Sequence, residues 1–185
     1  MASSSQQAPV YAHVFKAMLY IPATSPLPYE FLKKAGLGAN SPEFQERSGP
    51  MGLKFGSLPI ASSKGTDLIY FWRLQQNAVK PHMANAIGKP YVQGAFFGAY
   101  LFDMQDPNGL DDFEAYAQVL TQTLPPEKLY LVGLSKKEQM GSPQSQQNGQ
   151  IADALFKSKR LGAHALLSEK DIDDFYALLT EASNP

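Results

Sequence analysis

The chain has 185 residues and no cysteine. Disulfides, thiolate nucleophiles, iron–sulfur clusters and cysteine-ligated zinc are therefore excluded. Charged residues are scarce at 18%, whereas hydrophobic residues make up 44% of the chain, which is near the average for folded proteins. This composition predicts an ordered chain, and the length suits one domain with a substantial core.

Segments that would direct the chain to a membrane are also lacking. No run approaches the roughly 18 consecutive apolar residues that a transmembrane helix needs. The first nine residues, MASSSQQAP, have neither the basic nor the apolar region of a secretory signal. We therefore expect a disordered tail over residues 1–9, no membrane association and a cytoplasmic protein.

Sequence signatures of catalysis are missing as well. The chain contains no G-x-S-x-G elbow, no P-loop and no G-x-G-x-x-G motif. Its three histidines, His13, His82 and His164, lie far apart and lack the spacing of zinc enzymes. We interpret His13 as a hydrogen-bonded core histidine on an apolar strand face and place His82 near a surface. The sequence thus predicts no catalytic residue, no metal and no cofactor, and favours a protein that is not an enzyme.

Acidic residues do cluster between Asp103 and Glu114, around the turn DPNG at 106–109. A calcium loop needs oxygen ligands at its positions 1, 3, 5 and 12 and glycine at position 6. With Gly109 at position 6, however, position 1 is Met104 and position 12 is Ala115. The acids are better explained by a turn followed by the first turn of a helix, where they complement the helix dipole.

Hydrophobic periodicity gives the expected elements. Residues 10–21 fit either a strand or a helix, with β-branched and aromatic content favouring the strand. Further strands are expected at 51–60, 66–74, 91–104 and 128–135. Helices are expected at 28–36, 110–123 and 151–160 and after a Ser168 cap. Residues 22–64 are expected to form a long irregular excursion, and residues 136–150 an exposed polar loop.

This order of elements predicts one α+β domain over residues 10–182, with a mixed or antiparallel sheet and three or four helices. The segments 99–120 and 128–133 resemble dimeric α+β-barrel proteins, in which a strand leads through an Asp-Pro turn to a helix bearing Phe and Tyr. That resemblance implies only a fold. Ferredoxin-like and α+β-barrel-like arrangements are therefore the alternatives.

Aromatic residues make up 11% of the chain and are concentrated in two of the expected strands. If these strands pair, their aromatic and polar side chains could line an apolar pocket for a small apolar or aromatic ligand. The candidate ligand-binding residues are Tyr70, Trp72, Arg73, His82, Tyr91 and Tyr100. A filled core is the competing interpretation of the same residues.

Nucleic acid is not expected as a partner, because the aromatics in QGAFFGAY lack the alternation of an RNA-binding strand. The net charge is −1 overall, yet residues 1–102 carry +5 and residues 103–185 carry −6. Such asymmetry can orient a protein partner or a second copy. We expect a non-catalytic binding or assembly protein, either homo-oligomeric or a subunit of a larger complex. A small metal-independent enzyme or carrier, and then a single-strand nucleic-acid binder, are the alternatives.

Overall fold

All described strands belong to one sheet of seven. The structure, a computed structural model, describes residues 10–36, 47–48, 54–62, 64–74, 76–79 and 89–183. Its strands are β1 (Val14–Tyr20), β2 (Arg47–Ser48), β3 (Lys54–Ser62), β4 (Gly65–Leu74), β5 (Phe97–Asp103), β6 (Leu129–Ser135) and β7 (Ala163–Ser168). Its helices are α1 (Leu27–Lys34), α2 (Gln76–Val79), α4 (Lys89–Val92), α5 (Phe113–Leu120), α6 (Pro143–Lys159) and α7 (Ile172–Ser183), with 3₁₀ turns η3 (Pro126–Lys128) and η4 (Lys137–Gln139).

The sheet is mixed, in the order β2-β3-β4-β1-β5-β6-β7. The five strands from β4 to β7 run parallel, and β3 and β2 are antiparallel to their neighbours. The prediction of a single-sheet α+β fold with a mixed sheet is confirmed. Four of the described helices have eight or more residues, as expected. Five adjacent parallel strands differ, however, from the antiparallel sheet of a ferredoxin-like arrangement.

The ambiguous segment 10–21 is a strand, β1, and it lies in the middle of the sheet. It pairs in parallel with β4, where Val14 is opposite Leu68, and with β5, where Ala17 is opposite Phe97. The expected central position of 66–74 is also confirmed, because β4 lies between β3 and β1. Strands buried on both faces read as continuous apolar runs, which explains the poor alternation of these sequences.

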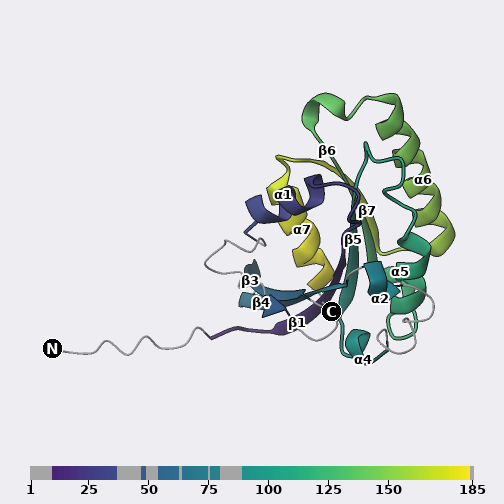
Figure 1. Cartoon of the computed structure of the whole chain (residues 1–185). Coiled ribbons are helices and arrows are strands. Elements are labelled where there is room, and N and C mark those ends of the chain that lie inside the picture. The colour runs from purple at the N-terminus through teal and green to yellow at the C-terminus, as the bar shows by residue number, and fades with distance from the viewer. Residues whose placement is uncertain are drawn as a thin grey trace.

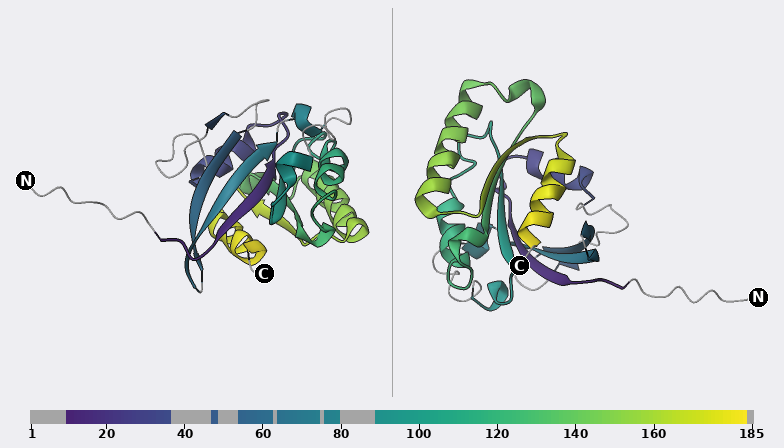
Figure 2. Two further views of the ribbon diagram at one scale, coloured as in Figure 1. Left: turned by 90° about the horizontal axis from the view of Figure 1, so that it is seen from below. Right: turned by 180° about the vertical axis from the view of Figure 1, so that it is seen from behind.

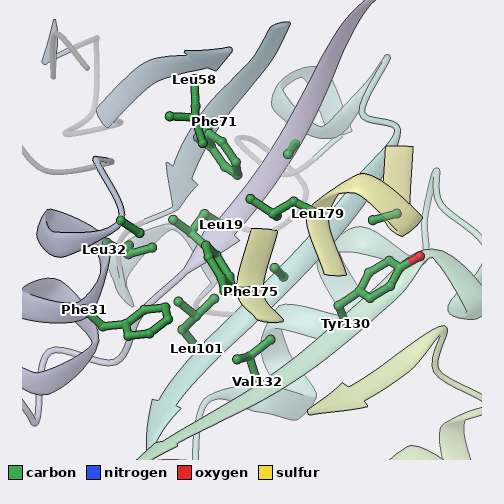
Figure 3. Close-up of a cluster of buried hydrophobic side chains, with 14 of the residues drawn as sticks. Leu19, Phe31, Leu32, Leu58, Phe71, Leu101, Tyr130, Val132, Phe175 and Leu179 are labelled. Carbon is green, nitrogen blue, oxygen red and sulfur yellow. The ribbon is translucent and has the colours of Figure 1, made fainter. Parts of the chain in front are cut away.

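Two helical layers cover the sheet, with α1 and α7 on one side and α5 and α6 on the other (Figures 1 and 2). The first side encloses a core in which Phe31 of α1 and Phe175 of α7 meet edge to face, with ring centroids 5.3 Å apart (Figure 3). Both rings are fully buried. Burial of such a side chain stabilises the fold by about 1.5–3 kcal/mol. The second side encloses a separate core that contains three buried tyrosines, Tyr20, Tyr100 and Tyr116.

The expected strand at 91–104 is shorter than predicted. Its first residues form the end of α4, and the strand begins only at Phe97. Gly94 lies between the two with φ +76°, a left-handed conformation that glycine adopts without the steric cost of a Cβ. At Gly98 two side chains approach the backbone closely, since a Cβ there would lie 2.2 Å from Leu120 Cδ1 and 2.8 Å from the Tyr116 hydroxyl.

The prediction of a polar loop at 136–150 is wrong. These residues contain η4 and the first half of α6. Ser142 caps the helix by accepting a hydrogen bond from the backbone N–H of Ser145, and Pro143 occupies the first turn. The glutamine-rich composition that suggested a loop is compatible with a helix, because glutamine is a good helix former.

The helix predicted at 151–160 is the second part of α6, which ends at Lys159. The left-handed residue is Arg160, with φ 54° and ψ 47°. Strand β7, which follows, was not predicted, because its six residues AHALLS are short and weakly β-forming. The helix predicted after Ser168 is confirmed as α7. There the Asp171 carboxylate accepts the Ser168 N–H at 2.7 Å, while the Ser168 hydroxyl accepts the Lys170 N–H.

The segment predicted as an irregular excursion, 22–64, contains α1 and the nine-residue strand β3 among its described residues. The predicted helix at 28–36 is confirmed, and Gly36 follows it in the left-handed conformation with φ 74°. The helix predicted at 110–123 is shorter, because α5 spans only Phe113–Leu120 and turns lie on both sides of it.

Candidate functional site

In open sheets with parallel strands, ligands bind beyond the carboxyl ends of the strands, where successive connections leave in opposite directions. Here the chain passes from β1 to β4 on one side of β1, and then from β4 to β5 on its other side. The carboxyl ends of β1 and β5 therefore mark the expected position of a site. We examine this region, called the β1–β5 edge, which comprises Tyr20, Ser25, Asp103, Asp112 and Asn148.

Tyrosine rings fill the space beneath the β1–β5 edge. Tyr20 and Tyr100 stack with centroids 5.1 Å apart, and Tyr116 lies 5.5 Å from each of them. All three are fully buried, and each hydroxyl donates to a protein acceptor: Tyr20 to the Asp112 carboxylate at 2.6 Å, Tyr100 to the Gly109 carbonyl and Tyr116 to the Met18 carbonyl. Burial raises the pKa of all three phenols well above the ordinary value.

The loop between β1 and α1 is fixed to the end of β5. The Ser25 hydroxyl donates to Asp103 Oδ2 at 2.6 Å, and Asp103 Oδ1 accepts the Gln105 N–H at 2.8 Å. The Ser25 oxygen in turn accepts the N–H of Leu27, the first residue of α1. A hydroxyl that caps a helix and donates to a carboxylate is held in a structural role. No described histidine side chain bonds to it.

The same loop is unsuited to phosphate. In P-loop proteins the strand–loop–helix unit carries G-x-x-x-x-G-K-[ST], whose backbone N–H groups and lysine hold the anion. The loop here reads IPATSP over residues 21–26 and has no glycine and no lysine. Its N–H donor at Leu27 is occupied by Ser25, and the Asp103 carboxylate beside it would repel an anion.

Asn148 of α6 closes the β1–β5 edge from the far side. This side chain is 3% exposed, and its amide donates to the carbonyls of Met104 at 2.9 Å and Asp106 at 2.8 Å. The Gln105 side chain also bonds to the start of α6, because it donates to the Ser142 hydroxyl at 2.8 Å. The β5–α5 loop is thus bonded to α6, and of the carboxylates that looked like ligands in the sequence Asp103 and Asp112 have protein partners, whereas Asp106 Oδ2 is buried without one among the described residues.

Replacement of Asn148 by alanine should destabilise the fold by about 2 kcal/mol, because the buried Met104 carbonyl loses its donor and the Asp106 carbonyl keeps only the Gly109 N–H. For a chain of this size the melting temperature should fall by about 4–8 °C. The control is Gln146→Ala, which removes the hydrogen bond of an exposed amide to the Gly141 carbonyl in the same helix. Equal thermal-denaturation midpoints for the two variants would contradict the role assigned to Asn148.

The structure brings together two of the six predicted ligand-binding residues. Trp72 and Tyr91 lie with ring centroids 6.2 Å apart, and Phe55 packs on the other side of Trp72 at 5.9 Å. Lys16 Nζ lies 4.2 Å from the centroid of the Trp72 ring and donates to the carbonyls of Tyr91 and Gln93. This lysine therefore caps the end of α4, and burial lowers its pKa.

Two of the other predicted residues, Tyr100 and Arg73, lie apart from that pair. Tyr100 is fully buried among the tyrosines described above, so it does not line a shared pocket with Trp72. Arg73 faces the opposite side of the sheet, where its guanidinium lies 4.8 Å from the Tyr29 ring centroid. Tyr70 is 44% exposed, and His82 lies outside the described residues.

The two described histidines have separate structural surroundings. His13 is hydrogen-bonded to the buried Asp67 at 3.0 Å, as expected, although it is exposed rather than buried. His164 packs beside Phe156 with ring centroids 6.0 Å apart, and burial lowers its pKa. Within the described ranges, no group of three or more His, Asp or Glu side chains is placed to hold a metal ion.

Sequence reasoning missed Ser25, Lys16 and Asn148. Ser25 carries a local signal, since a serine just before an apolar helix start is a typical cap. The partners of Lys16 and Asn148 are backbone carbonyls 75 and 44 residues away, for which a single sequence gives no signal.

No described helix is long and apolar enough to cross a membrane. Comparison with known proteins adds no functional assignment: the chain matches no protein-family model, and it matches no curated protein significantly.

Proposed function

We propose that the chain is a non-catalytic binding or assembly protein that associates with a second copy of itself. The observation that carries this proposal is the filled β1–β5 edge. The position at which sheets of this kind bind substrates is occupied by the chain's own hydrogen-bonded Tyr20, Ser25 and Asn148. A protein that closes this position must act through other parts of its surface.

One such surface is a sheet face that lacks a long helix. Alternate residues of β1, β3 and β4 point away from α1 and α7, and Figure 2 shows these strands in front of both helices when seen from below. Parallel strands are usually covered on both sides. We call Val14, Lys16, Ser57, Pro59 and Tyr70 the open face. Together with the buried Leu68 of β4, they form two adjacent rows across the three strands.

The open face is apolar enough to support association. Val14 is 59% exposed and Tyr70 is 44% exposed, the largest values for apolar side chains on the described strands. Exposed aromatic residues are common anchors of protein interfaces, and a tyrosine at the centre of one can contribute 2 kcal/mol or more. The positively charged N-terminal half and the negatively charged C-terminal half would also favour contact between copies.

The substitution Tyr70→Asp should weaken self-association at least about tenfold, because it places a charge in the contact. Sedimentation velocity over a range of protein concentrations measures the dissociation constant. Ile151→Asp is the matched control, since Ile151 is 41% exposed but lies on α6 at the far end of the sheet. A wild-type chain that stays monomeric throughout would overturn the self-association.

The proposal that the chain is non-catalytic is tested separately, with phosphate, nucleoside triphosphates and Mg²⁺ as probes of the β1–β5 edge. A ligand that binds the folded state raises its stability by RT ln(1 + [L]/Kd). We expect no change in melting temperature with any of these probes at about 1 mM. If one of the probes raised the melting temperature, and if Ser25→Ala or Asp103→Asn abolished this increase, the β1–β5 edge would be a ligand site and the proposal would be refuted.

A further inference from the structure

A cavity of about 430 Å³ lies between α5 and the end of α6. Its floor consists of Ala117, Leu129 and Leu161, and Glu114 and Lys159 stand at its rim. Sites for small molecules typically have volumes of roughly 300–1,000 Å³ and mostly apolar walls with a few polar groups. Leu129 is the first residue of β6, so the cavity is at the opposite end of the sheet from the β1–β5 edge.

The rim carries one ion pair, between Lys159 Nζ and Glu114 Oε2 at 2.9 Å. The Glu114 side chain is 61% exposed and the Lys159 side chain 42% exposed. Exposed pairs of this kind contribute little stability, so Glu114 can turn into solvent at small cost. A carboxylate brought by a ligand could then take its place on Lys159.

The backbone at the end of α6 brings a second observation. Arg160 is the single non-glycine residue with positive φ within the described ranges, at φ 54°. In a helix, residues two positions apart point to different sides. Lys159 and Leu161 nevertheless line the same cavity, which requires the helix to break between them. Left-handed non-glycine residues are strained and concentrate at functional sites.

We propose that this cavity binds a small, mostly apolar molecule with one carboxylate group. The carboxylate pairs with Lys159, and the apolar part contacts Leu129, Leu161 and Ala117. The cation is the fixed member of the rim pair because its helix turn is set by Arg160 and because it is the less exposed of the two. This ligand site is independent of the open face and of the proposed self-association.

The experiment measures ligand binding to the full chain with benzoate, phenylacetate and hexanoate, by thermal shift and by calorimetry. Benzamide and benzylamine serve as neutral and cationic counterparts. The acids should raise the melting temperature in a concentration-dependent way, whereas the amide should do so weakly and the amine not at all. Stabilisation by the amine equal to that by the acids, or none by any acid at about 10 mM, would overturn the proposal.

Variants at the rim should shift the dissociation constant in opposite directions. Lys159→Gln should weaken binding of the acids about tenfold, because it removes a charge-assisted hydrogen bond. Glu114→Gln should tighten binding several-fold, because the competing carboxylate is gone.

Ala115→Leu, which adds volume to the cavity wall, should abolish binding. Lys157→Gln is the control on the same helix, since Lys157 pairs with Asp153 away from the cavity lining. Equal effects of Lys157→Gln and Lys159→Gln would contradict the assigned site.

Discussion

Stability should fall steeply once the pH rises above about 10, at a rate that approaches about 4 kcal/mol per pH unit. Tyr20, Tyr100 and Tyr116 are fully buried, and burial raises the pKa of each phenol. In the unfolded chain these groups lose their protons near pH 10, the ordinary value for tyrosine. Burial raises the pKa of Tyr130 as well, so above that pH the unfolded state binds at least three fewer protons than the folded state, and stability decreases as the pH rises.

Lys16 opposes this loss of stability, but only below its unfolded-state pKa. Burial lowers the pKa of Lys16, so the folded state loses that proton first and gains stability until about pH 10.4, the unfolded value. Beyond it both states are neutral at Lys16 and the three tyrosines dominate. Because folded domains are stable by only about 5–15 kcal/mol, we expect cooperative unfolding within a few pH units of the tyrosine value.

Urea denaturation at a series of alkaline pH values measures the slope, and phenolate absorbance reports the ionisation. Tyr116→Phe should reduce the slope by about 1.4 kcal/mol per pH unit, since one of the titrating protons is lost, at a cost of about 1 kcal/mol from the loss of the hydrogen bond to the Met18 carbonyl. If all nine tyrosines ionised together near pH 10 while the fold persisted, the buried hydroxyls would be accessible to water.

Elements with strong local signals could be predicted from the sequence. β4 and β6 are apolar runs between turn residues, and α7 combines a cap with an apolar stripe. The polar first half of α6 and the short strand β7 could not be predicted in this way. Their order comes from tertiary contacts, such as the bonds of Asn148 to the β5–α5 loop and the parallel pairing of β7 with β6. Strand direction had no local signal either, which left the antiparallel alternatives open.

For the candidate ligand-binding residues, the sequence could indicate which aromatic residues to consider, but it could not indicate which of them are in contact. Trp72 and Tyr91 are in contact, whereas Tyr100 is fully buried and Arg73 lies on the opposite face of the sheet. The alternation of side chains along β4 separates Trp72 from Arg73 whatever the fold. The burial of Tyr100 depends on α5, whose Phe113 and Tyr116 pack against it, and this requires the structure.

Substitution of Gly162 by alanine should be the most damaging of the point changes considered, with a loss of about 3 kcal/mol. A Cβ at this position would lie 2.0 Å from the Glu127 carbonyl oxygen and 2.9 Å from its carbon. Both partners are backbone, so no side chain can rotate away. The Gly162 N–H is also bonded to the Leu129 carbonyl at 2.8 Å, which holds the glycine against η3.

Two other glycines separate the causes of this loss. Gly141→Ala should change stability by less than about 0.5 kcal/mol, because no atom lies within 4 Å of the new Cβ. Gly94→Ala also meets no atom within 4 Å but has φ +76°, so it should cost about 1–2 kcal/mol through the dihedral alone. In thermal denaturation the midpoint should fall least for Gly141→Ala, more for Gly94→Ala and most for Gly162→Ala, where we expect a decrease of about 6–12 °C. A cost at Gly162 no greater than at Gly94 would mean that η3 can move away from β7, and the cavity wall that Leu161 forms beside it would not be rigid.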